Sequence, residues 1–174
     1  PKDSIVLRSG DGTAPWRMQR RDRLSAGGDA LSAPGYDVSG WSRAIVPGTV
    51  LNSLVANGVY PEPYFGLNNA VRAQRIPDLF DWGREIYTYW FRTEFELTPA
   101  FEGRRVILQF DGINYRASVW LNGVNVGDLA GMFRRGVFDD TDHVNRKGRN
   151  ALAVLVEPPD VTGGREPKKG REGA

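Results

Sequence analysis

Carboxylates are the most numerous residues with catalytic potential in this chain, which has 21 Asp and Glu, one His and no Cys. Two carboxylates about 5 Å apart can serve as the nucleophile and the acid/base of a hydrolase. No acidic residue here lies in a context that marks such a pair. Glu157, the strongest candidate, ends an apolar run just before two prolines, as a surface residue at a strand end does. We therefore expect no catalytic residue in this chain.

His143 is of a type that can act as a general base near neutral pH. No Ser or Cys in a nucleophile context accompanies it, so we interpret it as a loop residue. A single His and the absence of Cys exclude disulfides and Cys-ligated zinc. The sequence predicts neither a metal site nor a cofactor.

The stretch 60–84 is the part of the chain where we expect function. It is aromatic, interrupted by prolines and without a regular period, and a loop this long in a compact domain usually has a function or is disordered. Aromatic faces and short polar groups are the mixture that sugar recognition uses. The candidates for the rim of a sugar site are Tyr64, Phe65, Asn68, Asp78 and Trp82. The alternative is that these aromatics pack against a neighbouring domain.

Trp90 and Trp120 alternate with charged or polar neighbours along their segments. An indole can stack on a sugar ring, but we interpret both as packing residues between sheets or against a neighbouring domain. Asn122 and Gly123 are also assigned a structural role. They separate two β-rich runs, which predicts a hairpin with a type I′ turn.

Other segments of the second half predict the strands that must position these residues. In 87–97, apolar and polar residues alternate with a period of two, which predicts a strand with one buried face. Val106, Leu108 and Phe110 show the same alternation. The apolar run 151–157 predicts a strand buried on both faces, and the two prolines after it stop the strand.

The first half is less regular. Short strands are expected at Ser4–Leu7 and Trp16–Arg20, and a loop is expected over 21–40. Thr49 is expected to cap a short helix that Gly58 ends. With 21 Gly and 11 Pro, the pattern predicts an all-β fold, a mostly antiparallel β-sandwich with one short helix.

Charge and hydropathy exclude two classes of partner. The net charge is +2 with both signs mixed along the chain, and no basic run is flanked by stacking aromatics, so no nucleic acid is expected. No apolar run approaches the length of a membrane span, and no segment predicts a signal peptide. The absence of Cys does not fix the compartment.

Four segments between Trp41 and Val156 make the chain resemble the N-terminal domain of glycoside hydrolase family 2, in the branch of β-mannosidases, endo-β-mannosidases and exo-β-glucosaminidases. They are VPGTVLNSLVANGVYPEPYFGLN (46–68), YWFRTEFEL (89–97), FDGINYRASVWLNGVNVG (110–127) and GMFRRGVFDDT (131–141). The resemblance implies a galactose-binding-like jelly roll packed against a (β/α)₈ barrel. That barrel would carry the two catalytic glutamates, and loops of the jelly roll would reach the rim of its pocket.

The resemblance also implies boundaries. The jelly roll is expected over residues 1–157, and 158–174 is expected to be an irregular tail or a truncated continuation. The Trp- and Asp-rich segment that usually completes the sandwich in the family is missing. An unpaired sheet edge recruits other chains, so we expect the isolated chain to self-associate or to be marginally stable.

The first functional hypothesis is a non-catalytic domain of a retaining β-glycosidase of mannosidase or glucosaminidase type. Its role would be to support the barrel and to line one side of the site for the carbohydrate substrate. The alternatives are a stand-alone carbohydrate-binding module and a purely structural interaction domain. The isolated chain is expected to be inactive in all three cases.

Overall fold

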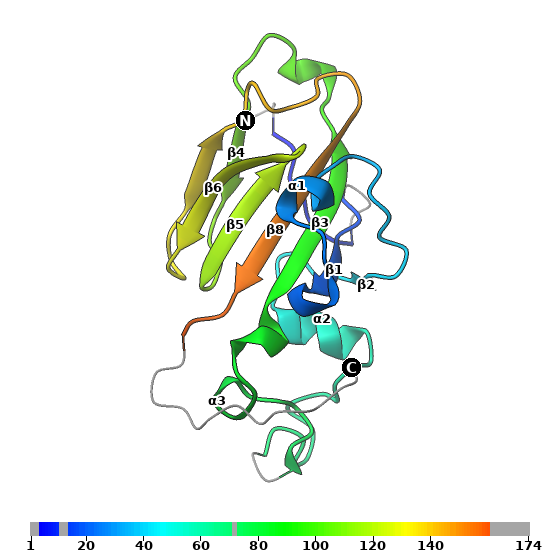
Figure 1. Ribbon diagram of the computed structural model, residues 1–174, viewed down its shortest axis with the longest axis vertical. Coiled ribbons are helices and arrows are strands. Elements are labelled where there is room, and N and C mark those ends of the chain that lie inside the picture. The colour runs from blue at the N-terminus through cyan, green and yellow to red at the C-terminus, as the bar shows by residue number, and fades with distance from the viewer. Residues whose placement is uncertain (1–3, 11–13, 71–72, 161–174) are drawn as a thin grey trace.

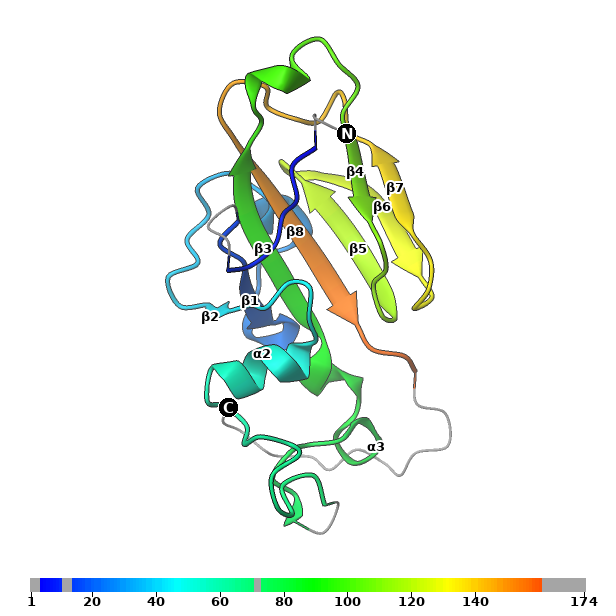
Figure 2. The same ribbon diagram turned by 180° about the vertical axis from the view of Figure 1, so that it is seen from behind.

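The chain forms two antiparallel sheets in a computed structural model that describes residues 4–10, 14–70 and 73–160. The larger sheet has the strand order β2-β1-β3-β8-β5-β6, and the smaller one pairs β4 with β7 (Figures 1 and 2). The strands are β1 (Arg17–Arg20), β2 (Ser42–Arg43), β3 (Tyr89–Glu96), β4 (Ile107–Phe110), β5 (Arg116–Leu121), β6 (Val124–Ala130), β7 (Gly136–Asp139) and β8 (Arg149–Glu157). The helical segments are η1 (Arg21–Arg23), α1 (Gly28–Leu31), α2 (Val50–Ala56), α3 (Leu79–Trp82), η3 (Arg84–Tyr87) and η4 (Pro99–Phe101).

The all-β fold class and most strands predicted from the sequence are confirmed. Strands β1, β3, β4 and β8 lie in the predicted segments, and β8 ends at Glu157 directly before the two prolines. The strand predicted at Ser4–Leu7 is wrong, because these residues form no ladder. The expected tail lies outside the described residues from position 161 onward.

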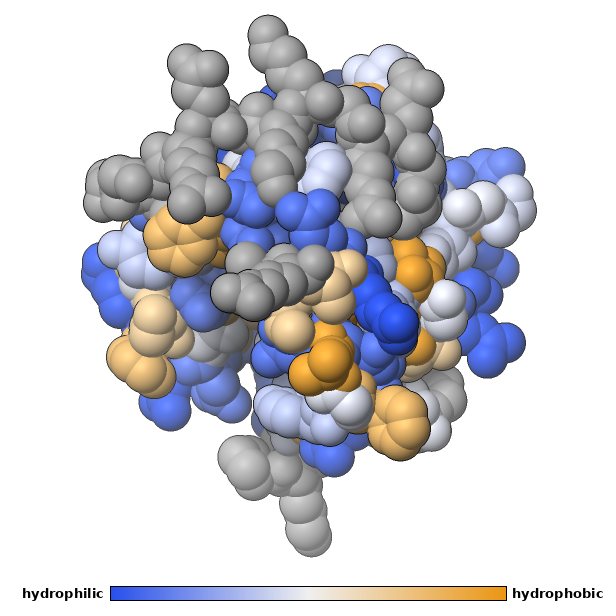
Figure 3. Space-filling view, turned by 90° about the horizontal axis from the view of Figure 1, so that it is seen from below, coloured by the Kyte–Doolittle hydropathy of each residue, from blue (hydrophilic) through white to orange (hydrophobic). Residues whose placement is uncertain are grey.

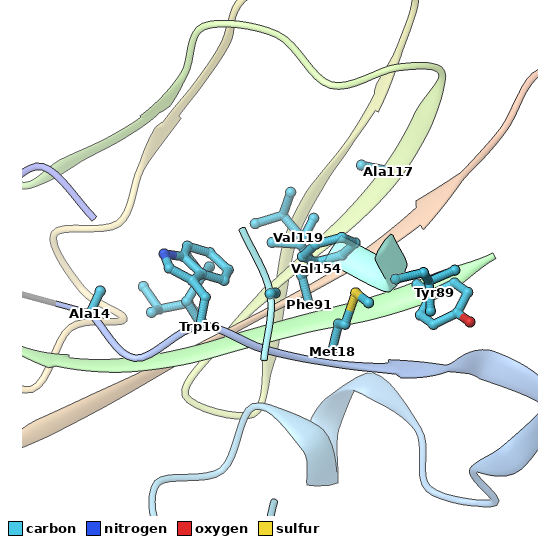
Figure 4. Close-up of a cluster of buried hydrophobic side chains, with 12 residues drawn as sticks. Ala14, Trp16, Met18, Tyr89, Phe91, Ala117, Val119 and Val154 are labelled. Carbon is cyan, nitrogen blue, oxygen red and sulfur yellow. The ribbon is translucent and has the colours of Figure 1, made fainter. Parts of the chain in front are cut away.

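The main core fills the space between the two sheets. Figure 4 shows Met18, Phe91, Val119 and Val154 gathered on one side of the larger sheet, and all four are buried. Partly buried side chains of the small sheet pack against this cluster: Leu108, Phe110 and Phe138. The period-two alternation in the sequence reports this buried face.

The opposite face of the larger sheet is also buried, which the sequence did not predict for β3. Trp90 is 6% exposed and packs in a second cluster with Leu31, Trp41 and Ala153. The cover is the segment 24–41, which was expected to be a plain loop and instead contains the short helix α1 lying in front of the sheet (Figure 1). The prediction of one buried face on β3 and that of a single helix are therefore both wrong.

Arg92 fastens this cover to the sheet. Its side chain is 4% exposed, and its guanidinium donates to the carbonyl oxygens of Leu31 (2.8 Å) and Ala33 (2.9 Å). The same group donates to Glu94 Oε1 at 2.5 Å. The carbonyl oxygens of Leu31 and Ala33 lie at the end of a helix too short to bond them itself. The Arg92 side chain supplies a hydrogen-bond donor to each of them.

The β5–β6 hairpin turns at Asn122-Gly123, as predicted. Both residues have positive φ, 51° and 88°, the conformation that a type I′ turn requires and that Gly tolerates best. The Asn122 side chain donates to the carbonyl oxygen of His143 (2.7 Å) and to Asn150 Oδ1 (2.8 Å), and it accepts from the amide of Ala151 (2.9 Å). The turn is therefore tied to the start of β8.

Helix α2 begins where the sequence predicts. Thr49 is its N-cap, and the Thr49 hydroxyl accepts from the amide of Asn52 at 3.0 Å. Leu54 is buried against the main core, and Gly58 follows the helix with a φ of +73°. In Figure 1 this helix lies at the lower end of the sheet, directly above the loop that carries α3.

Candidate functional site

The loop 60–84 lies at the lower end of the sandwich (Figures 1 and 2). Hydrogen bonds within the loop hold its described part in one conformation. Asn68 is 6% exposed, and its side-chain amide donates to the carbonyl oxygen of Glu62 at 2.9 Å. Arg75 donates to Asn68 Oδ1 at 2.8 Å. Asp78 caps α3 by accepting from the amide of Asp81 at 2.8 Å. The described part of the loop is therefore a folded feature of the domain.

Two tyrosines, the partly buried Tyr87 and the buried Tyr89, lie where the loop returns to the sheet, and Tyr87 is bonded to the loop. The Tyr87 hydroxyl donates to the carbonyl oxygen of Pro77 at 2.7 Å, and burial raises the pKa of this phenol well above its ordinary value. Burial, together with nearby Tyr60, also raises the pKa of Tyr89 to about 12. Both phenols stay neutral at physiological pH and remain hydrogen-bond donors.

The loop presents a group of exposed apolar side chains, which we call the apolar tip. Their exposed fractions are 93% for Tyr64, 76% for Phe65, 77% for Leu67 and 60% for Phe80. Seen from below, this end of the molecule has hydrophobic side chains at its surface among hydrophilic ones (Figure 3). Exposed apolar groups on a fixed loop are typical of a binding surface.

The structure divides the five rim candidates into two groups. Tyr64 and Phe65 are exposed and take no part in the core. Asn68 and Asp78 use their polar groups to hold the loop, and Trp82 is partly buried at the end of α3. Sequence reasoning missed Leu67 and Phe80, since an apolar residue in an irregular segment carries no signal of its exposure.

The carboxylates that stand out among the described residues are held in ion pairs or buried. Glu157 accepts from the Arg84 guanidinium at 2.9 Å, which suits a strand-end residue. Hydrogen bonds from Thr141 and Arg105 lower the pKa of Asp139 to about 2. Burial raises the pKa of Asp140, as a general acid would need, but this residue is 1% exposed and out of reach of a substrate.

The environment of His143 is that of a loop residue. Its Nδ1 lies 3.3 Å from Asp140 Oδ1, and its backbone amide donates to the Asp140 carbonyl oxygen. No group of three or more His, Cys, Asp or Glu side chains that could hold a metal ion occurs in the described parts of the chain. None of the helices described is long and apolar enough to cross a membrane.

Trp90 and Trp120 lie on the outer face of the larger sheet, beneath the segment 24–41. Trp90 is buried and Trp120 is half-buried beside it. The backbone of Gly28 lies against the Trp120 indole so closely that a Cβ at Gly28 would come within 2.4 Å of the ring. Both indoles therefore contribute to packing, and both also line an open hollow of about 430 Å³ between the sheet and residues of the segment 21–28.

Comparison with known proteins agrees with this architecture. An endo-β-mannosidase acting on mannosylglycoprotein, from Lilium longiflorum, is 42% identical over 161 residues, which is 91% of this chain and 16% of that protein. An exo-β-D-glucosaminidase of Streptomyces avermitilis is 33% identical over 82% of this chain and 15% of that protein. The chain thus spans about a sixth of the length of these curated relatives.

Solved structures and a family model cover the same region. The exo-chitosanase of Amycolatopsis orientalis superposes with a TM-score of 0.69 at 30% identity, over 86% of this chain and 17% of that one. The model of the glycosyl hydrolase 2 galactose-binding domain-like family matches residues 16–172. That match includes both sheets, the outer cover and the loop with the apolar tip, and the chain therefore belongs to the glycosyl hydrolase 2 galactose-binding domain-like family.

Proposed function

We propose that this chain is a non-catalytic domain of a larger, retaining β-glycosidase of mannosidase or glucosaminidase type. The domain supports the catalytic (β/α)₈ barrel, and its apolar tip lines one side of the sugar site. Its contribution to the reaction is to position the substrate and exclude water, with no proton transfer by its own residues. The relatives that suggest this class are an endo-β-mannosidase and several exo-β-glucosaminidases.

The observation that carries the proposal is the contrast between the tip and the loop beneath it. Tyr64 and Phe65 are more than three-quarters exposed, while Asn68 of the same loop is buried, and both its amide nitrogen and its amide oxygen are hydrogen-bonded. Ordering such a loop has an entropic cost, and exposing aromatic rings on it gains nothing for folding alone. A surface of this kind is suited to stacking on a sugar ring or against the barrel that holds the sugar.

The acid residues support a non-catalytic role. A retaining glycosidase needs one accessible carboxylate with a raised pKa and a second, ionised carboxylate beside it. Among the described residues, the carboxyl group whose pKa is raised is that of Asp140, which is buried in the sandwich. Its neighbour Asp139 is pinned to Arg105 and Thr141 on the surface.

The experiment is a kinetic comparison in the longer polypeptide to which this domain is proposed to belong. Replacing Tyr64 and Phe65 together by Ala should lower kcat/KM for an oligosaccharide by about tenfold or more, which is about 1.4 kcal/mol of lost transition-state binding. Phe133→Ala is the matched control, because Phe133 is 92% exposed but lies in the turn between β6 and β7. Equal kcat/KM values for the tip variant, the control and the unmodified protein would refute the role of the tip.

A further inference from the structure

The turn between β7 and β8, residues 140–148, joins the two sheets, and we call it the sheet joint. In Figure 2 this connection crosses the upper end of the sandwich, at the end opposite to α3. On the side of the small sheet, the amide of Asp140 donates to the carbonyl oxygen of Val106 at 2.9 Å. On the side of the larger sheet, the carbonyl oxygen of His143 accepts from the Asn122 side chain at 2.7 Å. A change at this turn therefore acts on both layers of the domain.

Asp140 places an ionisable group inside the sheet joint. The residue is 1% exposed, and its Oδ1 lies 3.3 Å from Nδ1 of His143. Within the part of the chain that the structure describes, its Oδ2 is buried and has no hydrogen-bond partner. Solvent does not reach this oxygen, so a water molecule does not replace the missing donor. An ionised carboxylate that is buried with one oxygen lacking a donor costs much more free energy than the neutral acid.

The charges around Asp140 do not compensate for its burial. Burial raises the pKa of Asp140 and the charge of Asp139 adds to this, while the hydrogen bond and charge of His143 lower it; the pKa stays above the ordinary 3.8. The other cations at the joint are bound elsewhere: Arg105 to Asp139, Arg146 to the carbonyl oxygens of Phe101 and Arg104, and Arg149 to Glu94. The remaining charged side chains nearby are exposed to solvent, which screens them: Glu102, Arg104, Asp142 and Lys147.

We infer that Asp140 is a proton-controlled switch in the sheet joint, in which the neutral acid keeps the turn closed and the carboxylate loosens it. The carboxylate has to find a second donor, and the turn must open to let water supply it. The inference goes beyond the proposed function, because it concerns the response of the domain to pH and involves neither the apolar tip nor the barrel.

The sign of the effect follows from the two states of the chain. In the unfolded chain Asp140 loses its proton near the ordinary 3.8, whereas in the folded domain it keeps the proton to a higher pH. Between these two values the folded state binds more protons than the unfolded state. The contribution of Asp140 to the free energy of unfolding therefore falls as the pH rises from 3.8 through the raised pKa.

The direct test is a pH titration of the chain labelled with ¹³C at the aspartate carboxyl carbons, followed by NMR spectroscopy. The Asp140 signal should titrate above pH 3.8. Asp139 is the matched control, because it is the adjacent residue and hydrogen bonds from Thr141 and Arg105 lower its pKa to about 2. An Asp140 signal that titrates at or below pH 3.8 would overturn the inference.

Variants connect the proton to stability and to His143. Asp140→Asn does not titrate, so the ratio of the unfolding constants of the two proteins should change by up to about tenfold per pH unit between the ordinary and the raised pKa. The corresponding ratio for Asp139→Asn should stay constant above about pH 5. His143→Leu removes the donor that favours ionisation and should move the Asp140 titration to still higher pH. A constant ratio for Asp140→Asn, or an Asp140 titration that His143→Leu leaves in place, would overturn the switch.

Discussion

Glu94→Gln tests the claim that a buried ion pair holds the cover on the outer face of the sheet. Arg92 and Glu94 have side chains that are 4% and 18% exposed, and their closest atoms are 2.5 Å apart. Glu94 also accepts from the amide of Gly35 at 2.7 Å. Leaving a buried charge unpaired costs about 3–5 kcal/mol. Gln keeps the shape and one acceptor oxygen, so we expect the free energy of unfolding to fall by about 2–3 kcal/mol.

The pH dependence of this effect has a definite sign. Burial alone raises the pKa of Glu94, but hydrogen bonds from Arg92 and Gly35 and the charge of Arg149 outweigh it, and the pKa lies below the ordinary 4.5. The carboxylate therefore contributes stability above pH 4.5, and that contribution is lost as the pH falls through the lowered pKa. Gln does not titrate, so the difference between the two proteins should shrink in acid.

The assay is urea unfolding followed by tryptophan fluorescence at neutral pH and again in acid. Glu96→Gln is the control, because Glu96 is exposed on the same strand and should change stability little. Two results would refute the reasoning: equal losses for both variants at neutral pH, or a Glu94→Gln loss that stays constant as the pH is lowered.

Other substitutions test the turn, the helix cap and the tip. Gly123→Val should lower the free energy of unfolding by about 1–3 kcal/mol, because φ at this position is +88° and a β-branched residue is strained there. An unchanged melting temperature would contradict the assignment of the turn. Thr49→Ala should lower the free energy of unfolding by about 1 kcal/mol through the lost cap to Asn52, while Thr49→Ser should not. We expect the isolated chain to self-associate at high concentration through the exposed rings of the tip. Replacing Tyr64 and Phe65 together by Ser should lower the apparent mass measured by light scattering. An equal apparent mass for the two proteins would show that the tip does not mediate the self-association.

The strands could be predicted from the sequence wherever their alternation reports burial on one face. For β3 this reasoning failed at Trp90 and Arg92, because a segment far away in the sequence covers the second face. The composition of 24–41 gives no sign that this segment packs on the outer face of the larger sheet. Helix α1 has only four residues, too few for a hydrophobic period to be visible.

The candidate site was predictable only in part for a similar reason. The aromatic content of 60–84 drew attention to this loop, and the structure shows that the rings of Tyr64 and Phe65 are exposed on it. Sequence could not separate them from Asn68, since the burial of a polar residue depends on how an irregular loop closes on itself. The hollow at Trp90 was equally hidden, because its wall and floor come from distant segments.

The most direct test of the central claim is a hydrolysis assay of the purified 174-residue chain beside the longer polypeptide to which it is proposed to belong. The substrates are p-nitrophenyl β-D-mannopyranoside and p-nitrophenyl β-D-glucosaminide. The account predicts that the longer protein cleaves one of them, while the chain alone releases no nitrophenol above the uncatalysed rate. Turnover by the chain alone that disappears in its Glu157→Gln variant would contradict it.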